Sequence, residues 1–111
     1  MEIKILNLCS HVVTVKNVTT GEEVTFQPEN KEYPARVQNG LATIFKLGKI
    51  DICKRTEPSN INLPPARDGH LYIVSRPVAI ANADRHDLLV PCGLVKDVMG
   101  EVQYCTGLEV I

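Results

Sequence analysis

Residues 71–83, LYIVSRPVAIANA, decide the fold class of this chain. Leu71 to Ser75 is a short apolar run, rich in β-branched residues, and predicts one buried strand. Pro77 suits the first turn of a helix, and the Ala-rich segment after it favours a short helix over 77–83. A buried strand that leads directly into a short helix predicts an α+β domain.

Short alternating segments on both sides of this stretch predict a sheet of mostly antiparallel strands. Turn residues separate them, above all the tight-turn pair Asn39-Gly40. We expect about seven to nine short strands, and the segment 41–45 fits either a strand or the start of a short helix. The segments with this pattern are 2–8, 12–18, 23–26, 35–37, 41–45, 50–54, 71–75, 88–90, 95–105 and 108–111.

Length and composition predict a single globular domain over 1–111. The chain has 111 residues, of which 44% are hydrophobic and 23% charged, values that are ordinary for a folded domain. Pro58, Pro64 and Pro65 lie in the longest irregular stretch, 57–69, which we interpret as a functional lid or a mobile connector.

Charge and cysteine usage exclude several classes of protein. The formal net charge is −1, without the basic stripe that binding of duplex nucleic acid requires. No apolar run is long enough for a membrane span, and residues 1–4 do not begin a signal peptide. The four cysteines form no C-x-x-C pair, which indicates a cytoplasmic protein with reduced thiols and no structural metal. Nucleotide-binding glycine loops are absent, so no cofactor is predicted.

The predicted ligand site is the polar cluster Asp84-Arg85-His86-Asp87 together with Arg76 and Lys96. Arginine side chains bind phosphate or carboxylate through two parallel hydrogen bonds. If the strand and helix pack together, the guanidinium groups of Arg76 and Arg85 approach each other. The alternative is structural: the cations lie at a helix C-terminus, and Asp84 and Asp87 cap and pair locally. The predicted ligand-binding residues are Arg76, Arg85, His86, Asp87 and Lys96.

The charged segment Arg67-Asp68 with His70, in the Pro-rich loop, either closes over a ligand or is a solvated connector. Three other arrangements of reactive residues lack the surrounding signature that their chemistry needs. They are a Cys92 thiolate with His86, a zinc site from Cys9 and His11 with Cys92 and Cys105, and a Ser75 nucleophile with His70 or His86 and an aspartate. No oxyanion device, paired metal-ligand spacing or G-x-S-x-G turn accompanies them. We therefore predict no catalytic residue and no metal ligand.

The chain resembles a group of small, mostly uncharacterised proteins of phages and bacteria. In that group the first block reads asparagine-leucine-threonine-proline-histidine, so this chain departs from it at Cys9-Ser10. The resemblance implies an accessory protein of a phage or mobile element, acting by binding. The matching residues are Asn7-Leu8-Cys9-Ser10-His11, Ala35-Arg36-Val37, Tyr72-Ile73-Val74-Ser75, Arg85, Asp87-Leu88-Leu89-Val90-Pro91, Val95-Lys96-Asp97, Gly100 and Cys105.

Three function hypotheses follow from these observations. In the first, a non-enzymatic protein binds an anionic, nucleotide-like small molecule and sequesters a signal of host defence. In the second, the acidic second half blocks a host protein. In the third, a small hydrolase uses His86 and Asp87, which leaves the question of catalysis open. Edge strands with few prolines or lysines also predict pairing in a homo-oligomer.

Overall fold

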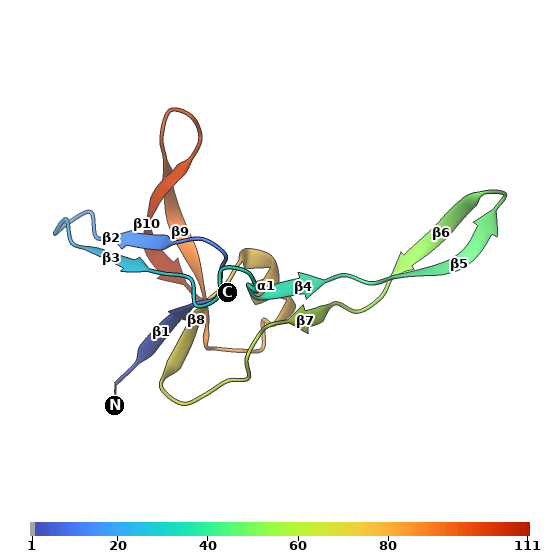
Figure 1. The fold of residues 1–111 in the computed structure, drawn as a ribbon, viewed down its shortest axis with the longest axis horizontal. Helices are drawn as coiled ribbons and strands as arrows, with labels where there is room; N and C mark the ends of the chain where they lie inside the picture. Colours follow the sequence, from blue (N-terminus) through green and yellow to red (C-terminus); the bar gives the residue numbers. More distant parts are fainter. Residues whose placement is uncertain (1) are drawn as a thin grey trace.

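The structure, a computed structural model, describes residues 2–111 and contains ten strands and one short helix in that range (Figure 1). The predicted β-rich α+β class, with mostly antiparallel strands, is confirmed. The strands exceed the predicted number by one, and the helix runs over residues 76–81 instead of 77–83. The elements are β1 (Lys4–Asn7), β2 (Val13–Lys16), β3 (Glu23–Phe26), β4 (Arg36–Gln38), β5 (Leu41–Leu47), β6 (Ile50–Arg55), β7 (Ser59–Ile61), β8 (His70–Ile73), α1 (Arg76–Ala81), β9 (Leu88–Lys96) and β10 (Val102–Glu109).

The main sheet has six strands in the order β1-β8-β9-β10-β2-β3 and is mixed rather than purely antiparallel. Strand β8 pairs in parallel with β1 and β9, and β10 pairs in parallel with β2. The parallel pairing of β8 with β9 follows from α1, because a helix between two strands returns the chain to the starting edge of the sheet. The pairs β9·β10 and β2·β3 are antiparallel, as the hairpin signals predict.

Alternation along β8 divides the core between the two faces of the sheet. Tyr72 and Val74 pack with Val78 of α1 on one face, whereas Ile73 packs with Val13 and the two buried cysteines on the other. The segment 71–75 is therefore the centre of the fold, as its apolar run predicts. Ile73 is fully shielded from solvent, and Tyr72 is 2% exposed.

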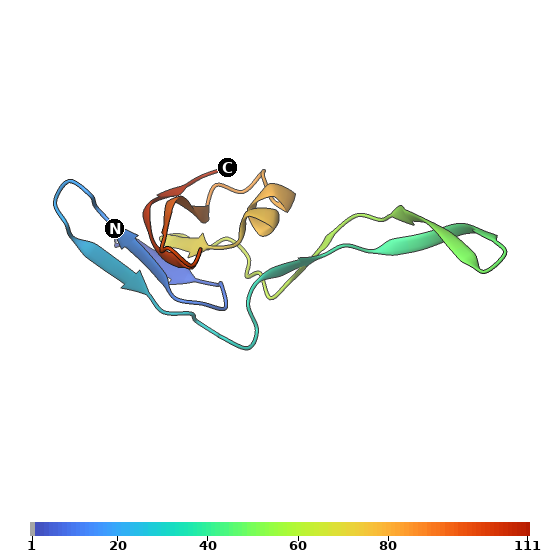
Figure 2. The same ribbon diagram turned by 90° about the horizontal axis from the view of Figure 1, so that it is seen from above.

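The segment from β4 to β7 leaves this body as a long extension (Figures 1 and 2). Strand β4 pairs with β7, and β5 pairs with β6 beyond them as a hairpin. The prediction of an irregular loop over 57–69 is wrong at Ser59–Ile61, which forms β7 because β4 supplies its hydrogen-bonding partner. The molecule measures 62 Å along its longest axis, so this extension dominates its shape.

Candidate functional site

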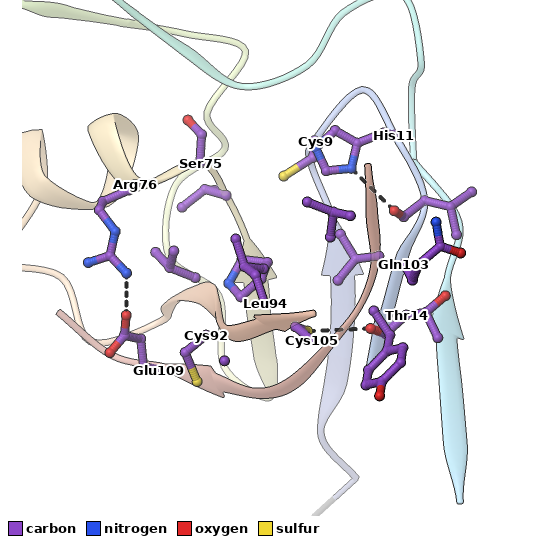
Figure 3. A pocket seen from close by; sticks show the side chains of 18 of the residues that line it. Cys9, His11, Thr14, Ser75, Arg76, Cys92, Leu94, Gln103, Cys105 and Glu109 are labelled. Atoms are coloured by element: carbon purple, nitrogen blue, oxygen red, sulfur yellow. Dashed lines mark hydrogen bonds and ion pairs between the residues drawn. The ribbon is translucent and has the colours of Figure 1, made fainter. Parts of the chain in front are cut away.

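A cavity of about 810 Å³ opens between the start of α1, the loop before β2 and the C-terminal hairpin β9–β10 (Figure 3). Its walls combine aliphatic side chains with a similar number of polar ones, and small-molecule sites likewise combine apolar walls with placed polar groups. Arg76 and His11 lie on opposite sides of it, with Ser75 between them. The polar residues that line the cavity are His11, Thr14, Ser75, Arg76, Glu101, Gln103, Tyr104 and Glu109.

The buried side chain of Asn7 holds the loop that carries Cys9 and His11. Its Oδ1 accepts a hydrogen bond from the backbone N–H of Cys9 at 2.9 Å. Its Nδ2 donates to the carbonyl oxygens of His11 at 2.8 Å and Phe26 at 3.0 Å. Two of these bonds satisfy backbone groups of the loop, and the third links the loop to the end of β3, so one side chain fixes the conformation of this cavity wall.

A second, smaller cavity of about 160 Å³ adjoins the first one. The two cavities share Cys9, His11 and Ser75, and the smaller one adds Arg36 at the start of β4. The two adjoining cavities are thus lined by one arginine each, Arg76 from α1 and Arg36 from β4, and they share a serine and a histidine. All residues that line this second cavity except Pro34 belong to sequence blocks quoted above for the resemblance. These blocks are 7–11, 35–37 and 72–75.

The two arginines differ in their electrostatic surroundings. Arg76 forms an ion pair with Glu109, and both side chains are about half exposed. Arg36 is exposed and has no ion-pair partner within residues 2–111. Because an exposed ion pair is worth little in free energy, an incoming anion competes readily with Glu109 for Arg76.

Cys9 and Cys105 form apolar walls of the larger cavity. Burial raises the pKa of both thiols, so both remain neutral and are poor nucleophiles. Within the described residues, no hydrogen bond links Cys92 to His86, and no group of three or more histidine, cysteine or acidic side chains is placed to hold a metal ion.

Arg85 and Asp87 pair with each other instead of facing the cavity. Arg85 Nε donates to Asp87 Oδ1 at 2.9 Å, its Nη2 donates to Oδ2 at 2.6 Å, and its Nη1 donates to the carbonyl oxygen of Pro64 at 2.9 Å. The hydrogen bonds from Arg85 lower the pKa of Asp87, and the same contact raises the pKa of Arg85. Through the bond to Pro64, the pair links the irregular segment after β7 to the start of β9. The bonds between Arg85 and Asp87 are a local pairing of the kind that the structural alternative predicts.

Of the five predicted ligand residues, Arg76 lines the larger cavity, and Arg85, His86, Asp87 and Lys96 line neither of the two cavities. Sequence reasoning did not select His11 or Arg36 as ligand residues. A signal was available, since both lie in blocks quoted for the resemblance. Their contribution depends on contacts between residues far apart in the chain, which local patterns do not reveal.

The Arg85–Asp87 pair predicts an acid-dependent loss of stability. The pKa of Asp87 is lowered below its ordinary value of 3.8 in the folded state. Its contribution to stability is therefore complete above that ordinary value and is lost as the pH falls through the lowered pKa. We expect Asp87→Asn to be less stable at neutral pH and to lose less stability on acidification than the unsubstituted protein, measured by urea unfolding from pH 7 to pH 2.

Asp68→Asn is the matched control for this measurement. Asp68 is exposed and forms no ion pair within the described range. Its substitution leaves the acid profile unchanged. An identical profile for Asp87→Asn and the unsubstituted protein contradicts the prediction.

Compared with models of protein families, with curated proteins and with solved structures, the chain matches none. The single helix in residues 2–111 is six residues long, too short to cross a membrane.

Proposed function

We propose that this protein binds an anionic small molecule in the two adjoining cavities, without catalysing a reaction. The observation that carries the proposal is the placement of Arg76 and Arg36 around the shared residues Ser75 and His11. Two guanidinium groups with a hydroxyl and an imidazole between them form a set of donors suited to phosphate or carboxylate. This set differs from the one predicted from the sequence, with which it shares Arg76 alone.

The cavity's shape supports a ligand with an apolar portion as well as an anionic group. A volume of about 810 Å³ lies within the range of about 300–1,000 Å³ that small-molecule sites occupy. Leu94 and Val102 line the larger cavity together with Arg76, so we expect the two aliphatic side chains to contact an apolar portion of the ligand and Arg76 to bind its anionic group. A nucleotide combines these two features, so nucleotides are the ligand class to test first. Membership of a phage or mobile element, and sequestration of a host-defence signal, stay predictions of the resemblance.

A thermal-shift screen against linear and cyclic nucleotides, NAD and ADP-ribose derivatives tests the proposal. Ligand at about 100 times its dissociation constant stabilises the native state by about 2.7 kcal/mol, a shift of several degrees. We expect Arg76→Ala and Arg36→Ala each to remove most of the shift, since each loses charge-assisted hydrogen bonds worth about 1.5–3 kcal/mol. Glu109→Gln should increase the shift, because it releases Arg76 from its competing carboxylate.

Lys96→Ala is the matched control, since it removes an exposed cation that lines neither cavity. It should keep the full shift. The proposal fails if no compound stabilises the protein, or if Lys96→Ala loses the shift as Arg76→Ala does. A decrease in Glu109→Gln would show that the carboxylate itself contacts the ligand.

One observation favours the rival function of blocking a host protein, but at a surface other than the predicted acidic second half. The β5–β6 hairpin displays large apolar side chains to solvent, as interaction surfaces do. A protein blocker co-purifies with its target and gains no stability from nucleotides. The hydrolase hypothesis gains no such support, because both carboxylate oxygens of Asp87 accept hydrogen bonds from Arg85.

A further inference from the structure

The β5–β6 hairpin, hereafter the arm (residues 41–55), has one apolar face. Residues directly opposite each other in an antiparallel pair share a face, as do residues two apart along a strand. Phe45 lies opposite Ile52 and Leu47 lies opposite Ile50. These four side chains therefore form one continuous apolar face at the end of the arm. The other face is polar there, where Lys46 pairs with Asp51 at 3.6 Å.

Within residues 2–111, no part of the body covers this apolar face. The exposed fractions of Phe45, Leu47 and Ile50 are 51%, 60% and 63%, and Figures 1 and 2 both show the arm projecting away from the six-stranded sheet. A lone two-stranded hairpin is marginally stable in water unless another surface packs against it. The arm therefore requires a partner surface.

The total exposed area indicates how large that partner surface is. A compact monomer of 12.3 kDa exposes about 6,100 Å², whereas this chain exposes 8028 Å². The radius of gyration is 17.5 Å, compared with about 13 Å for a compact domain of this length. The excess of about 1,900 Å² is more than the roughly 800 Å² that each partner contributes to a standard interface. The extension therefore exposes enough area for an interface of standard size.

We propose that the arm of one copy of this chain packs on the body of a second copy, and reciprocally, in a dimer. Charge complementarity favours the body of a second copy as the partner of the arm. The arm carries four basic residues and one acidic residue, a net charge of +3, whereas the whole chain has −1. The remainder therefore has −4. A basic arm with an apolar face suits an acidic body, and the exchange satisfies both arms at once by two-fold symmetry.

The same charges disfavour direct stacking of two arms. That arrangement places +3 against +3, and like charges across an interface oppose association. The two arrangements respond differently to salt, because salt screens attraction and repulsion alike. Added salt weakens an arm-to-body dimer and strengthens an arm-to-arm dimer.

Sedimentation equilibrium of the full chain over a range of concentrations and salt tests the proposal. We expect a dimer whose dissociation constant rises severalfold between low and high salt. Phe45→Ser combined with Ile50→Ser should raise the dissociation constant about 10–100-fold through lost apolar burial. The matched control is Lys46→Ser with Asp51→Ser, which removes the exposed ion pair on the other face of the arm without changing the arm's net charge and should keep the dimer unchanged.

Removal of the arm provides a second variant that keeps the fold. Gln38 of β4 already pairs with Ser59 of β7, so deleting 41–58 leaves the native Asn39-Gly40 as a two-residue hairpin turn. This variant should be monomeric and should unfold cooperatively, with a β-sheet circular dichroism signal reduced only by the contribution of the deleted strands β5 and β6. A monomeric full chain, a dimer that persists without the arm, or a dimer strengthened by salt overturns the proposal. A monomer that captures a foreign protein through the arm assigns the arm to the rival blocking function.

Discussion

Asn7→Leu should lower the free energy of unfolding by about 3–5 kcal/mol, the largest effect expected for a single substitution in this chain. Asn7 is 1% exposed, and leucine has the same branched outline with larger terminal groups, so the substitution keeps the side-chain shape and adds some crowding. The substitution leaves the N–H of Cys9 and the carbonyl groups of His11 and Phe26 without their partner. Each buried backbone group left unpaired costs about 1–3 kcal/mol. Urea unfolding followed by circular dichroism measures the loss.

The same substitution should also abolish ligand binding, because the loop that Asn7 holds forms a wall of both cavities. Asn60→Leu is the control. It removes an exposed side-chain amide pair with Asn82 and should cost under about 1 kcal/mol. A loss below about 1 kcal/mol for Asn7→Leu would mean that water or the backbone replaces the three hydrogen bonds, contrary to this account.

Arg85→Met should lower the free energy of unfolding by about 2–4 kcal/mol and the melting temperature by roughly 10 °C. The side chains of Arg85 and Asp87 are 19% and 14% exposed. Removing the cation leaves a largely buried carboxylate unpaired and releases the carbonyl of Pro64. Loss of one member of a buried pair costs more than loss of both. Arg85→Met combined with Asp87→Leu should therefore recover part of the stability, as a double-mutant cycle measures.

Arg67→Met controls for the general effect of losing a cation. Arg67 is exposed and makes no ion pair within residues 2–111, so the change should lie within about 0.5 kcal/mol. Ligand-induced stabilisation should survive in Arg85→Met, because Arg85 lines neither cavity. Full loss of that stabilisation would instead support the site predicted from the sequence.

The prediction of the fold succeeded where the pattern is local. The apolar run at 71–75 and the proline at Pro77 located β8 and α1 within a few residues. The prediction of a tight turn at Asn39-Gly40 is wrong, because the chain runs on from β4 into β5, and these strands pair with β7 and β6 instead of with each other (Figure 1). The prediction failed at Ser59–Ile61, whose own residues carry no strand signal, because β4 imposes the extended conformation through its hydrogen bonds.

Prediction of the site was limited in the same way. Arg76, Arg85 and Lys96 look alike in the sequence as cations near the ends of apolar runs. In the structure their contacts differ. Arg76 pairs with Glu109, Arg85 bonds to Asp87 and to the carbonyl of Pro64, and Lys96 lies at the end of β9. Arg36 joins Arg76 only because β4 reaches the cavity wall that the loop after β1 forms.

Alternation and turn residues along the chain were sufficient to establish a β-rich α+β class with one short helix, because these features depend on neighbours within a few residues. Long-range pairing decided the rest: the parallel partners of β8, the adjoining cavities and the arm that leaves the body. Those features depend on which segments meet across tens of residues. A local pattern determines on which face of a strand a side chain lies, whereas the pairing of strands determines which residues pack against that face.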